Sequence, residues 1–534
     1  MRYNIISILL LWASAAGAQT ELPSGKIEVI KDFEVRLTET KKIRIVPQPV
    51  PIDSAVRRYD YKLLAPSPSI EYLIPEIKPL AINPEKKPVY YPLFVKAGFG
   101  SPNSLLGMAS YDHVASEKFQ WGIDLRHLSA NNKKIELQKF SDSRGRIDGR
   151  YLLNEHTQID GYVDGHYETV YFYGAEFIPS NPDALKRHYN RYDAHFSIAK
   201  PYSPETSFSY KAFLQYLTDT DDLGSRETGF KAGGEVKSAL GKAAYPLGIS
   251  VLADLSKLVH TETHSLNNLL IEPYVEYYLG DLSLHVGAIA LLRKPQSEIL
   301  PALELSFPLF SRRLTLIAGW QGETEKNNFH FLSSYNPYIS TRLDSLNTMV
   351  SRRLYGGVKG NSGTLVFALT GGYTSFEGMA FYLQDEDNEE QFLPVYDDGS
   401  YLGIEGSIKF ELLKFVVLRA QLSQRFYMPD HEAKPWHVPS LDFSGQMTYS
   451  GGGDTYHVSV LFNLENGLPY RTVGGTEKVL DPLIDLNLHG DYYFSKSFGV
   501  FAEVNNILGN NRERWVNYPS FGFNAKAGIL FRLP

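Results

Sequence analysis

Apolar and polar residues alternate in short segments from about residue 91 to residue 534. The clearest segments place these apolar residues on one face: Phe119, Trp121, Ile123 and Leu125; Phe208, Tyr210, Ala212, Leu214 and Tyr216; Ile484, Leu486, Leu488 and Tyr492; Phe521, Phe523, Ala525, Ala527, Ile529 and Phe531. Because successive side chains of a strand point to opposite faces, each segment has one apolar and one polar face. The pattern predicts β-strands, which suit a membrane barrel and would also suit a soluble sandwich.

The lengths of the connections separate these two folds. Short turns are expected at Gly280-Asp281, 360–363 and 495–497, and they alternate with long connections. The longest include residues 174–188, 323–347 and 374–400. An outer-membrane barrel keeps short turns on its periplasmic side and long loops outside, whereas a sandwich has no reason to do so.

The strand count supports the same choice. Predicted strand centres lie near residues 97, 109, 123, 149, 163, 195, 211, 233, 252, 272, 287, 302, 317, 354, 369, 406, 421, 443, 460, 486, 502 and 526. These make about 22 strands, with roughly 20 to 24 as the working range. The odd connections include the five longest, as expected if the chain enters from the periplasm. Residues 91–534 are therefore predicted to form an all-β transmembrane antiparallel barrel with long extracellular loops.

The N-terminal part has a different organisation. Residues 1–18 are predicted to be a signal peptide, because an apolar run extends from Ile5 to Ala13 and small residues precede Gln19. Residues 19–90 are interrupted repeatedly by proline and are expected to form an extended periplasmic segment. The expected location is the outer membrane of a Gram-negative cell. Residues 27–37 are β-prone, and we expect either a strand offered to a protein partner or a solvated linker there.

Composition narrows the classes of function. The chain has no cysteine, which excludes disulfides, thiolate metal sites and a cysteine nucleophile. Its 35 Tyr and 30 Phe suit the aromatic girdles of a barrel. No later apolar run has the length of a membrane helix, and the net charge of -7 gives no indication of nucleic-acid binding. The expected surroundings are outer-membrane lipid and lipopolysaccharide.

The C-terminal residues resemble the closing hairpin of TonB-dependent receptors. The stretch 501–508 carries Val504-Asn505-Asn506-Ile507-Leu508, and Arg514-Trp515, Tyr518-Pro519 and Phe521-Gly522-Phe523 follow it. The opening 94–100 after a proline-rich segment is similar to barrel starts in receptor-like proteins of Bacteroidetes. The resemblance covers the architecture of the barrel, and its motifs are specific only toward the C-terminus. It implies a receptor-like barrel working in transport or within a membrane complex.

The sequence departs from that family at its start. A TonB-dependent receptor carries a large plug domain before its barrel, whereas only residues 19–90 are available here and they are not plug-like. A barrel of this size has a wide lumen that must be closed. The candidates are the N-terminal segment, inward-folded loops, lumen side chains or another chain. Energy-coupled transport therefore does not follow from the resemblance.

Several clusters of polar or aromatic residues are candidate sites. Residues 385–390 and 219–222 are rich in carboxylates, for which a hydrated loop is favoured over a calcium or lipopolysaccharide bridge. Asp485, Asn487, His489 and Asp491 share one strand face, as an ordinary polar lumen surface would. Arg144, Arg146 and Arg150 are expected to pair with carboxylates such as Asp160 and Asp164 rather than form a basic strip. The aromatic stretches 171–173 and 329–338 fit a binding surface, a girdle or loop packing equally.

No enzyme motif is apparent. Neither a nucleophile elbow, a zinc-binding histidine pair nor a phosphate-binding loop appears, and Gly451-Gly452-Gly453-Asp454 reads as a tight turn. No catalytic, cofactor or metal residue is therefore assigned. We expect a plug-less receptor-like subunit of an outer-membrane complex, acting in transport or in the handling of outer-membrane proteins or lipoproteins. A passive or partner-gated nutrient porin is the first alternative, and an outer-membrane enzyme is the second.

Overall fold

The computed structural model describes residues 91–174, 181–201, 208–239, 245–343, 345–453, 455–510 and 512–533. These residues belong to one compact unit. The predicted signal peptide (1–18), the proline-rich extension (19–90) and its segment 27–37 lie outside the described residues.

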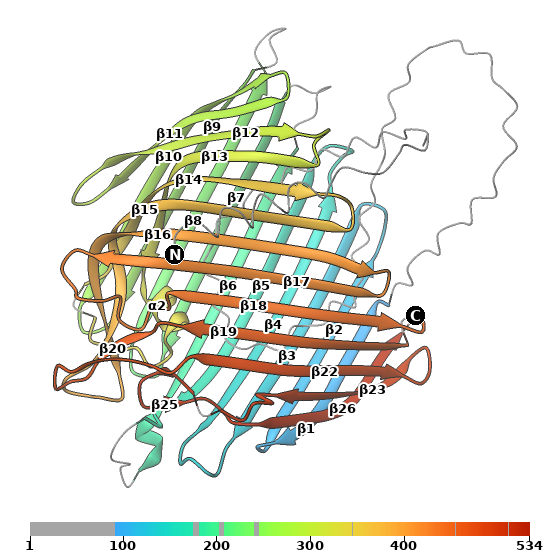
Figure 1. Ribbon diagram of the computed structural model, residues 1–534, viewed down its shortest axis with the longest axis vertical. Helices are drawn as coiled ribbons and strands as arrows, with labels where there is room; N and C mark the ends of the chain where they lie inside the picture. Colours follow the sequence, from blue (N-terminus) through green and yellow to red (C-terminus); the bar gives the residue numbers. More distant parts are fainter. Residues whose placement is uncertain are drawn as a thin grey trace, which may run out of the picture. The chain divides into compact units, whose positions relative to one another are not determined.

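The described chain forms one 22-stranded sheet of antiparallel neighbours that closes on itself when β1 pairs with β26 (Figure 1). The barrel strands are β1 (Leu93–Ser101), β2 (Ser104–Val114), β3 (Phe119–Asn131), β4 (Lys139–Leu152), β5 (Gln158–Tyr171), β6 (Lys186–Lys200), β7 (Phe208–Asp221), β8 (Arg226–Ala239), β9 (Pro246–Val259), β10 (Thr263–Leu279), β11 (Leu282–Arg293), β12 (Glu298–Leu309), β13 (Leu314–Asn327), β14 (Asn347–Asn361), β15 (Leu365–Gln384), β16 (Phe392–Leu413), β17 (Val416–Pro429), β18 (Leu441–Gly451), β19 (Tyr456–Asn466), β22 (Leu483–Tyr493), β23 (Phe498–Asn505) and β26 (Asn524–Leu533). Every predicted strand centre falls within one of these strands, so the predicted fold class is confirmed.

The seam between β1 and β26 is continuous. Pairing runs from Leu93 opposite Leu533 to Ser101 opposite Ala525. Gly98 and Gly528 lie opposite each other, and a Cβ added at Gly528 would lie 2.0 Å from the Ala97 carbonyl oxygen. Glycine at this position therefore allows the two backbones to approach closely enough to close the barrel.

The outward face of the wall is an apolar belt. The side chains of Leu125, Val163 and Leu214 are each at least half exposed. Ile123, Ile147 and Val163 lie side by side on β3, β4 and β5. Exposed aromatic residues gather near the short-turn ends of the strands: Phe119, Tyr151, Phe208, Phe307, Phe415, Phe494 and Phe498. This apolar band with an aromatic border is the surface that a transmembrane barrel presents to lipid. No helix among the described residues is long and apolar enough to span a membrane.

The inward face is polar, and many of its charges are paired. Lys96 lies 2.6 Å from Glu503 across β26, and Lys237 lies 2.5 Å from Glu276. These pairs are almost completely buried, so each charge is stabilised by its partner rather than by water. The polar side predicted for the strands is therefore the side that faces the lumen.

Long connections all lie at one end of the barrel, which we call the long-loop end. The five longest are residues 172–185, 328–346, 430–440, 467–482 and 506–523. All are odd-numbered connections of the barrel, and these lie at the same end because antiparallel strands return to that end at every second turn. The predicted alternation of loop lengths is thus present in the structure.

One predicted loop is wrong. Residues 374–400 form most of a hairpin, because β15 continues to Gln384 and β16 starts at Phe392. The pairing shifts between Phe376 and Met379, where Gly378 has a φ of +69°. Such a bulge bends a strand without ending it. The polar and glycine residues that suggested a loop instead mark this bend and the hairpin tip.

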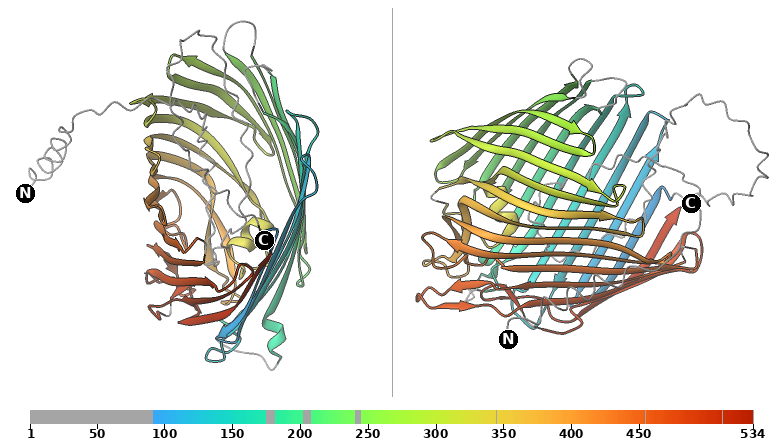
Figure 2. Two further views of the ribbon diagram at one scale, coloured as in Figure 1. Left: turned by 90° about the vertical axis from the view of Figure 1, so that its right-hand side faces the viewer. Right: turned by 45° about the horizontal axis from the view of Figure 1, so that its top comes forward.

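Three small elements were not predicted. The connection 328–346 contains the helix α2 (Phe329–Tyr335), and two hairpins, β20 (Pro469–Arg471) with β21 (Glu477–Val479) and β24 (Glu513–Trp515) with β25 (Tyr518–Pro519), lie in later connections. Figure 2 shows α2 between the two walls of the barrel rather than outside it. The longest connection therefore folds inward.

Candidate functional site

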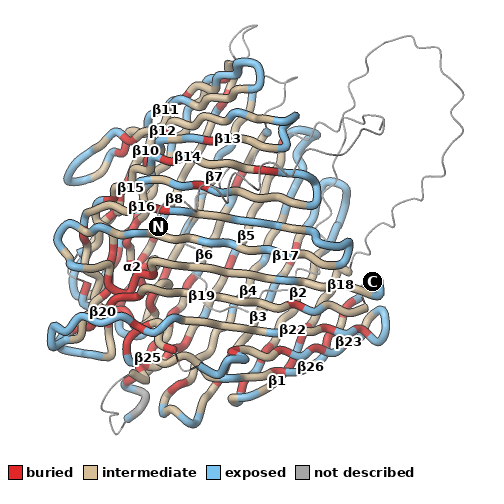
Figure 3. The backbone as a smooth tube through the Cα atoms, in the orientation of Figure 1, coloured by how far each residue is buried: buried red, intermediate tan, exposed pale blue. Residues whose placement is uncertain are grey.

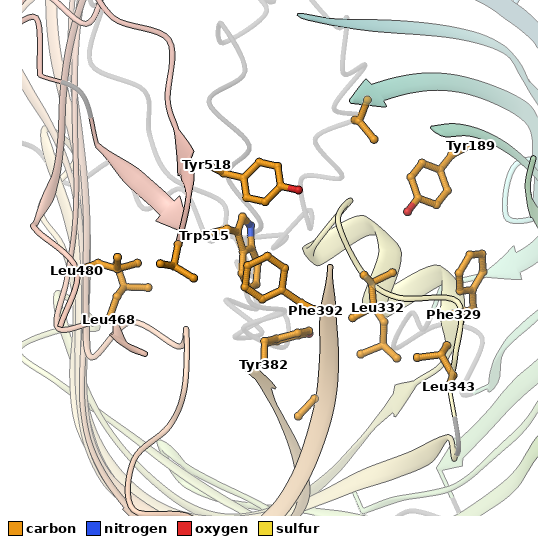
Figure 4. Close-up of a cluster of buried hydrophobic side chains, with 14 of the residues drawn as sticks. Tyr189, Phe329, Leu332, Leu343, Tyr382, Phe392, Leu468, Leu480, Trp515 and Tyr518 are labelled. Carbon is orange, nitrogen blue, oxygen red and sulfur yellow. The ribbon is translucent and has the colours of Figure 1, made fainter. Parts of the chain in front are cut away.

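The long-loop end carries an apolar core of its own, which we call the loop cap. It is formed by residues of four connections that are far apart in sequence, namely 328–346, the β15–β16 tip, 467–482 and 506–523, together with Val170, Tyr189 and Leu258 of the barrel wall. Its completely buried members are Tyr189, Phe329, Leu332, Ile339, Phe392 and Leu468. Buried positions gather around α2, β20 and β25 (Figure 3), and their side chains converge between the barrel walls (Figure 4).

Aromatic rings dominate the centre of the loop cap. The rings of Tyr338 and Tyr518 stack with centroids 3.7 Å apart. Trp515 meets Tyr382 edge-on at 5.2 Å and Phe392 at 5.1 Å. Each fully buried large apolar side chain contributes roughly 1.5–3 kcal/mol. The cap is therefore a packed core that holds four connections together.

A polar attachment fixes α2 to the wall of the barrel. Glu227 on β8 accepts hydrogen bonds from Asn328 Nδ2 at 2.7 Å and from the backbone N–H of His330 at 2.7 Å. Asn328 also caps the helix, because its side-chain oxygen accepts from Phe331 N at 3.0 Å. Glu227 is completely buried, so its charge depends on these donors.

A second set of contacts on β6 and β7 continues this attachment. Arg191 Nε lies 3.0 Å from Asp219, whose carboxylate also lies 3.2 Å from His330 Nδ1. The Tyr189 hydroxyl donates to the Pro337 carbonyl at 2.8 Å, and Arg187 donates to the Ile339 carbonyl. We call the wall residues Arg187, Tyr189, Arg191, Asp219 and Glu227, with the segment 328–339 that they bind, the latch.

Two histidines of the connection 430–440 experience opposite environments. His437 is completely buried, donates from Nδ1 to the Tyr382 carbonyl at 2.8 Å and stacks on Trp515. Burial lowers the pKa of His437 to about 3, so it is neutral within the cap. His431 is exposed and hydrogen-bonded to Asp397 at 2.7 Å, which raises the pKa of His431.

The two carboxylate clusters have different surroundings from those expected. Asp219 and Asp221 are not in a hydrated loop: they lie at the end of β7, and their side chains are fully buried against Arg191 and Arg187. That expectation is wrong because the inward face of β7 is covered by the connection 328–346. Asp385 is buried and paired with Arg342, while Asp387 beside it is exposed. No group of three or more His, Asp or Glu able to hold a metal ion occurs among the described residues.

The lumen strip of arginines is paired largely as predicted. Arg144 lies 2.9 Å from Asp164, and Arg150 lies 2.7 Å from Asp160. Arg146 places its guanidinium over the Tyr162 ring, 3.9 Å from the centroid, and its Nε lies 3.9 Å from Asp148. These arginines therefore do not present a free basic strip to the lumen.

The row on β22 forms part of a polar lumen network. Asp485 accepts from Asn487 at 2.9 Å and lies 3.3 Å from Arg512. His489 joins Asp491, at 2.9 Å, to Glu503, at 3.2 Å. The row is thus divided between two sets of neighbours.

The structure shows that most residues of the aromatic stretches 171–173 and 329–338 pack within the loops. Phe329 and Phe172 are buried, and Tyr173 and Tyr338 pack against the cap core. The residues that sequence reasoning missed are the wall members of the latch other than Asp219, namely Arg187, Tyr189, Arg191 and Glu227. Their signal was the alternation of Arg187, Tyr189 and Arg191 on one face of β6, which carries more charge and bulk than a water-filled lumen requires.

Among the residues that the structure describes, the loop cap and the latch pack together at the long-loop end, and no catalytic constellation lies among them. The apolar core of the cap joins the connections to one another, and the latch joins them to the wall. Such a structure can act as a fixed closure or as a gate, depending on whether the latch releases. Gly452 and Gly453 both have a φ above +60° in the predicted tight turn, which lies at the opposite end.

Comparison with known proteins gives a match in structure alone. No family model and no curated protein matches the sequence. The ferric enterobactin receptor PfeA of Pseudomonas aeruginosa is 12% identical, with a TM-score of 0.59 over 83% of this chain and 80% of that chain. The iron transporter FrpB of Neisseria meningitidis is 9% identical, with a TM-score of 0.62 over 83% and 81%. The copper transporter OprC is 11% identical, with a TM-score of 0.58 over 83% and 79%.

These likenesses establish the shared barrel fold. At such low identity they do not carry over a substrate. The resemblance of the C-terminal residues to TonB-dependent receptors is thus accompanied, at the level of the fold, by solved structures of siderophore and metal receptors.

Proposed function

We propose that this chain is a receptor-like barrel of the Gram-negative outer membrane that lacks a plug and is closed at its outer end by its own loops. In this proposal the long-loop end faces outward and the N-terminus lies in the periplasm. The chain works as a subunit of an outer-membrane complex, in transport or in the handling of outer-membrane proteins or lipoproteins. The fold shared with iron and copper receptors and transporters supports a transport-related, non-enzymatic role.

The single observation that carries the proposal is the loop cap. A barrel of 22 strands encloses a lumen wide enough to breach a membrane. Four connections meet over that lumen in a buried aromatic core, and the latch fixes them to the wall. A chain that closes itself in this way has less need of a plug domain.

The subunit role rests on the charges of the lumen and on the N-terminal extension. Paired carboxylates and basic groups on the wall do not form a one-sign lining that would select an ion. We assign partner binding to residues 27–37, whose β-prone sequence suits pairing with an exposed strand edge. Bacteroidetes-type receptor-like proteins remain the family that the barrel start resembles.

A partner-gated porin is the second candidate. It is favoured by one feature, namely that polar groups form part of the attachment of α2 to the wall, and water or a ligand can replace their hydrogen bonds.

Two measurements on the full-length protein test the proposal. A tagged copy is purified from native outer membranes in mild detergent, and the chains that accompany it are identified. Recovery with assembly, secretion or lipoprotein-handling proteins in fixed stoichiometry is expected. Planar-bilayer recordings should show no steady conductance. Recovery alone together with a large, steady conductance would contradict both the closed barrel and the subunit role, and would favour the porin.

A further inference from the structure

The lumen face of β17, β18 and β19 carries a group of uncharged polar side chains that we call the amide strip. It consists of Gln421 on β17, Ser444 and Gln446 on β18, and Asn463 on β19. Gln421 is opposite Ser444 and Ser444 is opposite Asn463, so the side chains lie on one face of three neighbouring strands. This face is the inward one, because the pairing of β19 with β22 and of β22 with β23 continues it to Glu503.

The amide strip has hydrogen-bonding groups that the barrel does not use. Within the described ranges of the chain, none of its four side chains forms a hydrogen bond or an ion pair with another residue. The charged groups beside it are already paired, since Asp485 lies 3.3 Å from Arg512 and Glu465 lies 2.8 Å from Arg514. Each amide brings two N–H donors and a carbonyl acceptor. The strip therefore suits a neutral ligand with many acceptors rather than an ion.

The amide strip lies in the half of the barrel near the short turns. Gln421 is five residues from the start of β17 at Val416, and Gln446 is five residues from the end of β18 at Gly451. At roughly 3.3 Å per residue, the strip is about 17 Å along the strands from the short-turn end. Because the loop cap is at the opposite end, a ligand reaches the strip from the short-turn side.

The beginning of the described chain is held on the lumen side of that same end. The guanidinium of Arg532 lies 4.1 Å from the centroid of the Tyr91 ring and 3.6 Å from that of the Tyr493 ring. Arg532 and Tyr493 are buried on the inward face, where they pair with Phe94 and Gly499. Tyr91 is thus held at the inner rim of the barrel, and the N-terminal extension joins the barrel at this rim.

Residues 70–82 of that extension, which lie outside the described residues, have a sequence that suits the amide strip. Pro75 and Pro79 lack an N–H group and favour an extended backbone for the residues before them. An extended chain leaves its carbonyl oxygens without internal partners, and amide N–H groups are donors for them. Seven of the thirteen residues are large and apolar: Ile70, Tyr72, Leu73, Ile74, Ile77, Leu80 and Ile82.

We propose that residues 70–82 lie in the lumen as one extended segment and bind the amide strip. The backbone carbonyls of the segment accept hydrogen bonds from Gln421, Gln446 and Asn463. Its apolar side chains meet Leu461, which lies opposite Gln446 on the same inward face. The distance is within reach, because the nine residues from Ile82 to Tyr91 span about 30 Å when extended.

The covalent connection favours this segment over a free peptide or another protein. A short linker gives a tethered ligand an effective concentration in the millimolar range, so weak contacts suffice for binding. Residues 38–69 are long enough to return to the short-turn end, which leaves residues 27–37 accessible to a partner. The inference rests on the proposed closure of the long-loop end and adds a contact in the other half of the lumen.

Paired cysteines test this contact in the full-length protein, because the chain has no cysteine of its own. One cysteine is Ser444→Cys, which leaves the three amides in place, and a bismaleimide is added to native outer membranes. The matched control is Gln215→Cys, whose side chain extends from the lumen face of β7 to Asp193. Folding is checked by the shift of the barrel on an unheated gel. The second cysteine is placed in the segment by one of four substitutions: Tyr72→Cys, Ile74→Cys, Ile77→Cys or Leu80→Cys.

At least one segment cysteine should cross-link to Ser444→Cys within the same chain, ten-fold or more faster than to Gln215→Cys. The triple variant Gln421→Ala/Gln446→Ala/Asn463→Ala removes donors that contribute roughly five-fold each to binding. It should therefore slow the cross-linking by ten-fold or more.

Equal cross-linking to both walls would overturn the inference, as would cross-linking between two chains or to another protein, or an unchanged rate in the triple variant. If no cross-link forms and planar-bilayer recordings show no steady conductance, the inference fails and the proposed closure stands. If the cross-link forms but the wild type shows a steady conductance, the inference is supported and the proposed closure is contradicted.

Discussion

Removal of the Glu227 carboxylate should loosen the loop cap. In the substitution Glu227→Ala, the side chain of Asn328 and the backbone N–H of His330 both lose the acceptor that they contact at 2.7 Å. Both donors lie at partly buried positions against the wall while the cap is closed. When the cap opens, water can satisfy them, so the change favours the open state.

The magnitude follows from those two hydrogen bonds. A hydrogen bond to a charged group contributes about 1.5–3 kcal/mol. Two of them amount to about 3 kcal/mol at the lower limit, which corresponds to a shift in the opening equilibrium of roughly 100-fold or more. Glu227→Gln retains one acceptor oxygen and should shift the equilibrium less.

A single cysteine can report this opening, because the chain has none of its own. Ser340 is suitable: it is 1% exposed, and its backbone N–H donates to the Phe392 carbonyl at 2.7 Å inside the cap. The assay measures how fast an impermeant maleimide labels Ser340→Cys on intact cells. The labelling rate should rise about 100-fold with Glu227→Ala, provided that closing is faster than labelling.

The matched control is Glu276→Gln. Glu276 is also a paired wall carboxylate, 2.5 Å from Lys237, but it lies toward the short-turn end of β10. Its loss weakens the wall without touching the cap, so labelling should stay at the starting rate. If Glu227→Ala folds and is labelled within two-fold of its parent, the latch does not hold the cap closed and the reasoning is wrong.

Three further predictions concern the β1–β26 seam, a buried ion pair on the lumen face and the acid sensitivity of the loop cap. Gly528→Ala should prevent barrel closure, because its methyl group would lie 2.0 Å from a carbonyl oxygen of β1. Gly107→Ala should be tolerated, because its methyl group would meet no atom within 4 Å. The gel shift of folded barrels distinguishes the two variants. Lys96→Met should cost about 3 kcal/mol of stability in urea, because Glu503 is left buried with weaker partners. The pKa of His437 is lowered to about 3 in the folded cap. Its contribution to cap stability is therefore complete above about pH 6.5 and is lost as the pH falls toward 3. Tryptophan fluorescence should show this acid sensitivity, and the substitution His437→Asn should reduce it.

The wall of the barrel could be predicted from the sequence because its information is local. Alternation over a few residues identifies a strand, and turn length identifies the end at which it turns. For the same reason the pairing of Arg144 with Asp164 was within reach, since adjacent strands of a meander bring these residues together. The β15–β16 hairpin was missed because Gly378 and the polar residues near it suggest a loop, although a bulge accommodates them within a strand.

The candidate site was harder to predict from the sequence because its contacts join connections that are distant in sequence. Nothing near Phe329 indicates that it meets the cap core, and α2 is only seven residues long. Asp219 was interpreted as part of an acidic loop, because its partners Arg191 and His330 come from another strand and from the longest connection. Sequence patterns define which faces are polar, but not which loop covers them.

A cap assembled from separate connections has a mechanical consequence. Tyr518 packs against Tyr338, and Trp515 against Phe392, so no connection buries its aromatic residues alone. Displacing one connection exposes the apolar surface of its neighbours, which makes opening cooperative. The latch is different, because its bonds to the wall are polar and can be replaced by water. The least costly route to an open barrel therefore starts at the latch, and its release lets the segment 328–339 move away from the β6–β8 wall.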